Sequence, residues 1–127
     1  MNIDHLDHLV LTVADIDASC AFYQDILGFE VVTFGQGRKA LAFGNQKINL
    51  HQVGREFEPK ALNPTAGAGD LCFIATTSIA EVVAELNAKG VAIAEGPVPR
   101  TGATGPILSV YIRDPDQNLI EIANLAP

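Results

Sequence analysis

Two stretches of the chain place groups that could do chemistry inside runs of apolar residues. His8 lies within residues 6–13, and Glu121 lies within residues 119–125. Both stretches have the branched apolar side chains that are typical of buried strands. A lone buried imidazole or carboxylate is costly, whereas a bound divalent metal would compensate both. The pair therefore indicates a metal site; the alternatives are a hydrogen-bonded core histidine and a carboxylate on a solvated edge strand.

The composition limits the class of protein and of partner. A chain of 127 residues, 48% apolar and 18% charged, predicts one compact globular domain. Its formal charge of −7 argues against nucleic acid and anionic membranes as partners. A small-molecule substrate is the partner we expect, and an anionic substrate would depend on local basic groups.

The cysteines and the N-terminal residues indicate the cellular compartment of the protein. Cys20 and Cys72 are too few for a disulfide framework, which favours reduced thiols. The first residues lack the basic start and apolar run of a signal peptide, and no stretch approaches the ~20 apolar residues of a membrane span. We therefore expect a cytoplasmic protein.

Turn residues and periodicity divide the chain into two similar halves. The first half predicts a strand over residues 6–13, a helix that Asp15 or Asp17 caps and Gly28 ends, and strands over residues 29–34, 39–43 and 47–53. The second predicts strands over residues 70–75, 91–94, 107–113 and 118–124, with a helix between Ser78 and Gly90 and a loop over residues 96–106. The predicted inward stripe of the first helix is Ile16, Cys20, Tyr23 and Leu27.

The halves match position by position. Gly28 and Gly90 are 90 − 28 = 62 positions apart, and His8 and Asp70 are 70 − 8 = 62 positions apart. We therefore predict an α+β fold of two tandem βαβββ modules, residues 4–54 and 70–125, joined by a connector over residues 55–69. One helix can cover only one face of each sheet, so we expect a curled mixed sheet around a central cavity. The predicted cavity lining is His8, Asn49, Asp70 and Glu121.

Three stretches carry a family resemblance that extends over essentially the whole chain. They are His8 in the first strand, residues 22–29 (FYQDILGF) and residues 113–121 (RDPDQNLIE). On these residues the chain resembles the vicinal oxygen chelate superfamily, which holds glyoxalase I, extradiol dioxygenases, fosfomycin resistance enzymes and bleomycin-binding proteins. Within it the chain looks closest to glyoxalase-domain-containing proteins, through residues 38–41, 49–51, 56–60 and 96–103. The resemblance implies a glyoxalase-like fold and leaves the reaction open.

The resemblance implies that His8 and Glu121 bind a divalent metal. The chain departs from the family at Asp70, which replaces a histidine, and at Asn49, where glyoxalase I carries glutamate. His51 faces the same side of its strand as Asn49 and lies ~6.6 Å further along it. We predict a site of His8, His51 and Glu121, with Asp70 as a fourth ligand or outer group; His51 could instead hydrogen-bond the substrate. Such ligands suit Fe, Mn, Ni or Zn without choosing among them.

The remaining predicted site residues would hold or act on the substrate. Asn49, Tyr111 and Arg100 are predicted to bind substrate, with Arg100 meeting an anionic tail; the alternatives are an ordinary amphipathic tyrosine and a solvated loop arginine. Glu121 or Asp70 would move the proton.

A metal that chelates two adjacent oxygens can stabilise negative charge on them. We therefore expect a metal-dependent, glyoxalase-like lyase or isomerase that acts on a small oxygenated metabolite. The alternatives are an extradiol-type dioxygenase, which the short chain disfavours, and a metal-free drug- or metabolite-binding protein of the resistance type. Exposed sheet edges predict a homodimer.

Overall fold

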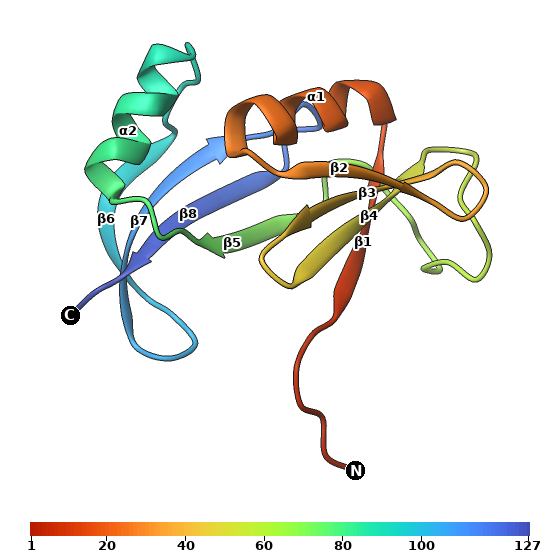
Figure 1. Cartoon of the computed structure of the whole chain (residues 1–127), viewed down its shortest axis with the longest axis horizontal. Coiled ribbons are helices and arrows are strands. Elements are labelled where there is room, and N and C mark those ends of the chain that lie inside the picture. Colours follow the sequence, from red (N-terminus) through yellow and green to blue (C-terminus); the bar gives the residue numbers. More distant parts are fainter. The chain divides into compact units, whose positions relative to one another are not determined.

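Two units make up the computed structural model, which describes all 127 residues: Met1–Ala68 and Gly69–Pro127. Each unit has the βαβββ order that the repeat predicts (Figure 1). The first contains β1 (His8–Val13), α1 (Ile16–Leu27), β2 (Glu30–Phe34), β3 (Arg38–Phe43) and β4 (Gln46–Gln52). The second contains β5 (Asp70–Ile74), α2 (Ile79–Ala88), β6 (Glu95–Thr101), β7 (Pro106–Arg113) and β8 (Leu119–Leu125). The tandem α+β architecture is therefore confirmed.

The strands form two four-stranded mixed sheets, one in each unit, as the predicted glyoxalase-like fold requires. Their orders are β1-β4-β3-β2 and β5-β8-β7-β6. In each sheet the first strand pairs parallel with the last, and the other pairs are antiparallel. The two sheets therefore repeat one pattern, with the predicted site strands β4 and β8 at equivalent central positions.

One helix lies against one face of each sheet (Figure 1). In the first unit this face carries buried Leu11, Leu41 and Leu50, and Tyr23 of α1 is fully buried. In the second unit Val82 and Leu86 of α2 are the buried helix residues. Successive strand residues point to opposite faces, so the polar residues of β1 and β4 that alternate with this core lie on the face without a helix.

The helix ends follow the sequence, whereas the buried stripe of α1 differs in part. The Asp15 carboxylate accepts hydrogen bonds from the backbone N–H groups of Asp17 (3.0 Å) and Ala18 (3.3 Å), and Gly28 ends the helix with φ 71°. Of the predicted stripe only Tyr23 is fully buried, and Ser19 is buried beside it. The other three predicted residues are half-buried, because a single helix on a sheet face retains solvent along its flanks.

An amide side chain on the last strand of each unit fixes the strand-to-helix junction. Gln52 accepts from the N–H of Ile16 (3.1 Å) and donates to the carbonyl of Ala14 (2.5 Å). Asn124 likewise accepts from the N–H of Ile79 (2.6 Å) and donates to the carbonyl of Thr77 (2.8 Å). These amides are 124 − 52 = 72 positions apart, as are Ile48 and Ile120, so the repeat extends to hydrogen bonds that position the helices.

The prediction for β6 was wrong. The strand covers Glu95–Thr101 and takes up most of the predicted loop, while residues 91–94 form no strand. Pro97 and Pro99 argued against a strand, but β6 is an edge strand that pairs only with β7, where missing N–H donors are tolerated. The register shifts between Glu95 and Val98, which accommodates Pro97. Arg100 therefore lies on a strand, not on a mobile loop.

At twelve and ten residues, neither α1 nor α2 has the length and apolar character that a membrane-crossing helix requires.

Substitutions at one buried and one exposed leucine, Leu41 and Leu62, test the assignment of the core of the first unit. Leu41 is fully buried in β3, and Leu62, in the connector, is 92% exposed. Leu41→Ala should lower the free energy of unfolding by roughly 2–5 kcal/mol, because it leaves a cavity. Leu62→Ala should change it by less than about 0.5 kcal/mol. Urea unfolding of both variants checks this, and equal effects would contradict the assigned core.

Candidate functional site

The face of the first sheet that lacks a helix brings three predicted site residues onto one surface. Strand β1 pairs with β4 so that Val10 lies opposite Asn49 and Thr12 lies opposite His51. Paired residues share a face, and so do residues two apart. His8, Asn49 and His51 are therefore on the same side of the sheet; alternation along the strand predicted this for Asn49 and His51, and the repeat predicted it for His8 and Asn49.

Asn49 and His51 are buried with polar atoms that have no partner. Their exposed fractions are 6% and 4%, and neither Asn49 Oδ1 nor His51 Nε2 makes a hydrogen bond. A buried polar atom without a partner costs about 1–3 kcal/mol, and such atoms are rare. Two of them, two residues apart on one strand, indicate groups that are kept for a ligand.

The surroundings of His51 favour the neutral imidazole. Phe57 lies edge-on to its ring, with the centroids 5.8 Å apart. Burial lowers the pKa of His51, and the positive charge of Arg38 lowers it further, against a smaller opposite effect of Glu56. At neutral pH the ring can therefore both donate and accept a hydrogen bond.

His8 is separated from His51 along the sheet. Its opposite residue on β4 is Lys47, four positions before His51, which corresponds to ~13 Å along the strand. One metal ion spans two histidines only when they are closer than this, so the register does not favour His51 as a ligand beside His8. The alternative, that His51 hydrogen-bonds a substrate, agrees with its unpaired Nε2.

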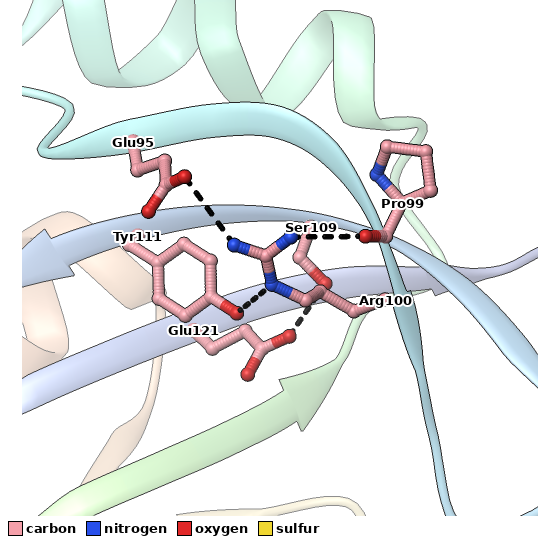
Figure 2. Close-up of polar contacts among 6 residues, drawn as sticks. All are labelled: Glu95, Pro99, Arg100, Ser109, Tyr111 and Glu121. Atoms are coloured by element: carbon pink, nitrogen blue, oxygen red, sulfur yellow. Dashed lines mark hydrogen bonds and ion pairs between the residues drawn. The ribbon is translucent and has the colours of Figure 1, made fainter.

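The open face of the second sheet gathers side chains around Glu121. Cys72 of β5 and Tyr111 of β7 lie opposite Glu121 on β8. The Ser109 hydroxyl donates to Glu121 Oε2 at 2.6 Å (Figure 2). Burial, followed by the charge of Glu121 and a hydrogen bond to it, raises the pKa of the Cys72 thiol to about 11. The raised pKa favours the protonated thiol at neutral pH, which suits Cys72 as a hydrogen-bond partner of Glu121.

Arg100 and Tyr111, the predicted substrate-binding pair, contact each other. Arg100 Nε donates to the Tyr111 hydroxyl at 3.0 Å, and its guanidinium lies 5.5 Å from the centre of the Tyr111 ring. Figure 2 shows the same guanidinium reaching Glu95 Oε1 (3.3 Å) and the carbonyl of Pro99 (3.1 Å). The hydrogen bond to Tyr111 raises the pKa of Arg100, with smaller contributions in the same direction from the charge of Tyr111 and then from Glu95. The positive charge of Arg100, which we expected to meet an anionic substrate, is therefore partly paired with Glu95 within the protein.

Two of the metal donors that the family implies, His8 and Glu121, each have a neighbouring polar side chain. His8 Nδ1 lies 2.8 Å from Asp7 Oδ2, and Glu121 is held by Ser109; such partners orient metal ligands in proteins. Asp70 is exposed at the start of β5, on the same face as Cys72 and Glu121. Neither unit gathers three or more His, Cys, Asp or Glu side chains that could hold a metal. His8 and Glu121 thus fit as individual donors, whereas the complete ligand set stays a prediction.

Four residues of these surfaces were not among the predicted site residues: Arg38, Phe57, Cys72 and Ser109. Ser109 shares a strand face with Tyr111, so alternation alone could have added it. The others reach the site through strand pairing or through the connector, and a strand's register with its neighbour is not fixed by its own sequence.

The lowered pKa of His51 predicts how stability depends on pH. The unfolded chain takes up a proton near the ordinary pKa of 6.5, while native His51 takes it up only at lower pH. The free energy of unfolding should therefore fall as the pH drops through about 6.5 and level off below the native pKa. Urea unfolding at about pH 7.5 and about pH 5.5 should show a smaller difference in His51→Gln than in the native protein. An unchanged difference would contradict the burial of His51.

Two relatives match nearly the whole chain. Virulence protein STM3117 of Salmonella typhimurium (strain LT2) is 63% identical over 123 residues, 97% of this chain and 85% of that protein. Its crystal structure matches with a TM-score of 0.98 and 62% identity, covering 99% of this chain and all of that one. Glyoxalase domain-containing protein RDO1 of Mycosarcoma maydis is 58% identical over 124 residues, 98% of this chain and 70% of that protein.

A less similar solved structure and a match to a protein family show which fold and family the chain shares. Lactoylglutathione lyase from Agrobacterium tumefaciens has a TM-score of 0.75 and 26% identity, covering 98% of this chain and 96% of that one. Residues 5–122 match the family described as the Glyoxalase/Bleomycin resistance protein/Dioxygenase superfamily. The glyoxalase-like fold that the resemblance implied is confirmed, and the chain belongs to this superfamily.

Proposed function

We propose that this protein binds a small oxygenated metabolite and acts on it as a metal-dependent, glyoxalase-like lyase or isomerase. The observation that carries the proposal is the pair of buried, unpartnered atoms Asn49 Oδ1 and His51 Nε2. A ligand with hydroxyl and carbonyl groups would satisfy both atoms. The 26% identity with a lactoylglutathione lyase supports the lyase assignment.

The proposed metal donors are His8 and Glu121. Each is oriented by a neighbouring side chain, His8 by Asp7 and Glu121 by Ser109. A divalent Zn, Ni, Mn or Fe ion would, when bound, chelate adjacent substrate oxygens and stabilise negative charge on them. His51 is assigned to the substrate and not to the metal, because of its distance from His8 along the sheet.

The other roles belong to polar groups on the open faces. Glu121 or Asp70 would accept and return the proton that an isomerisation moves, since a carboxylate within hydrogen-bond reach can do both. The Tyr111 hydroxyl, held by Arg100, would donate to a substrate oxygen. Asn49 and neutral His51 would orient the substrate, and their burial would exclude water from the groups they hold.

Metal affinity tests this proposal directly. His8→Ala and Glu121→Ala should each weaken binding of Ni²⁺ or Zn²⁺ by more than about 100-fold, beyond the 10–100-fold effect of losing an outer partner. Calorimetric titration of protein freed of metal, with elemental analysis of protein as expressed, measures this.

His5→Ala is the matched control for the metal test. His5 also has a carboxylate partner, Asp4, but it lies before β1. Its removal should leave the metal affinity unchanged. Native protein that takes up none of the four metals would contradict the metal assignment, and equal losses in all three variants would contradict the assigned donors.

A second function, metal-free binding of a drug or metabolite, is favoured by Asn49 itself. A neutral amide stands where the family implies a carboxylate ligand, and amide oxygens are weaker partners for transition metals. If the protein binds a ligand through Asn49 and His51 but takes up no metal, it is a binding protein and not a lyase.

The expected assembly and location are part of the same proposal. A homodimer remains a prediction from the exposed sheet edges. A cytoplasmic location remains a prediction that agrees with Cys20 and Cys72 being free thiols.

A further inference from the structure

A small pocket in the first unit concentrates positive charge. It has a volume of about 270 Å³ and lies where β3 begins and β4 ends. Arg38, Lys39 and Arg55 line it, and no acidic side chain does. The whole chain has 8 Lys and Arg against 15 Asp and Glu, so three of its eight cationic residues line one pocket of an acidic protein.

These cationic groups are not neutralised by the protein. The ion pairs made by lysine and arginine are Lys60–Glu58 and Arg100–Glu95, and neither involves the pocket. Glu56, beside Arg55 in the sequence, instead accepts from the backbone N–H of Gly54 at 2.6 Å. Unpaired charges of one sign in a concave site raise the local concentration of the opposite ion.

Arg38 is held in place by aromatic rings. Its guanidinium carbon lies 4.6 Å from the centre of the Phe57 ring and 5.1 Å from that of Phe34. Stacking on ring faces fixes the plane of a guanidinium and leaves its edge N–H groups to bind an anion in a fork. The Lys39 ammonium is also positioned, since it donates to the Thr33 hydroxyl at 2.7 Å.

Apart from Gly37 and Gln52, whose amide is engaged with Ala14 and Ile16, the remaining pocket wall is apolar. Ile16 of α1, Leu50 of β4 and Phe57 of the connector line it beside the charges. Drug-sized ligands occupy roughly 300–1,000 Å³, so a pocket below this range suits one ring or a short chain. The chemistry that matches is an anionic oxygen group on a small apolar body.

We infer that this pocket binds a small organic anion, an aryl or short-alkyl carboxylate or phosphate ester, through Arg38 and Arg55. Arg100, where the sequence placed the anion, is paired with Glu95, whereas Arg38 and Arg55 are not paired. Anion binding at this pocket requires neither a metal nor turnover. The inference can therefore be refuted while the proposed function holds, and the proposed function can be refuted while the inference holds.

Amide NMR titration of the full-length protein tests the inference. Phenyl phosphate and benzoate are the anionic probes, and benzyl alcohol is their neutral counterpart. We expect the anions to shift the amide resonances of residues 37–39 and 52–57. Benzyl alcohol should bind at least about tenfold more weakly, because it cannot accept charge-assisted hydrogen bonds. The tighter of the two anions identifies the class as phosphate ester or carboxylate.

Charge-removing variants make the test specific. Arg38→Gln and Arg55→Gln should each weaken binding about tenfold, and Arg55 is exposed on the connector, so its change leaves the core intact. Arg113→Gln removes an exposed charge from the other unit and should have no effect. Equal binding of benzyl alcohol, shifts confined to other residues, or unchanged affinity in a folded Arg55→Gln protein would each overturn the inference.

Discussion

The cost of burying a polar atom without a partner is the constraint from which the account of the site follows. Asn49 and His51 are nearly inaccessible, yet each has an atom that makes no hydrogen bond. Each such atom costs about 1–3 kcal/mol, a sizeable share of a small domain's net stability of about 5–15 kcal/mol. Evolution could remove the cost with two apolar residues, so we propose from their presence on one face of β4 that a ligand provides the missing partners.

The fold explains why such residues can gather on one surface. Each unit has a single helix, which takes up the apolar face of its sheet, and the last strand anchors that helix through Gln52 or Asn124. The other face is free to carry polar side chains. In the second unit Glu121 is oriented by Ser109, and Tyr111 is oriented by Arg100 (Figure 2). The same architecture thus supplies a rigid core and two polar faces.

Much of this could be predicted because it depends on local pattern and on internal repetition. Gly28 and Gly90 are separated by the same number of positions as His8 and Asp70, which predicted the tandem modules. Alternation along β4 placed Asn49 and His51 on one face. Strand β6 was missed because prolines are read as breakers, and only the sheet order reveals that this strand is an edge. The separation of His8 and His51 depends on the β1–β4 register, and the approach of Arg38 and Phe57 depends on the connector's path. Neither leaves a local sequence signal.

Stability of an Asn49→Leu variant tests most directly whether Asn49 is kept for a ligand. Leucine has a similar size and no polar atom, so the free energy of unfolding should rise by about 1–2 kcal/mol. Asn118→Leu is the control, since Asn118 accepts from the N–H of Gly69 (2.7 Å) and donates to Asp114 (2.8 Å) while buried. That variant should be less stable than the native protein. If Asn49→Leu is destabilised as Asn118→Leu is, then Asn49 serves the fold and the account of the site is wrong.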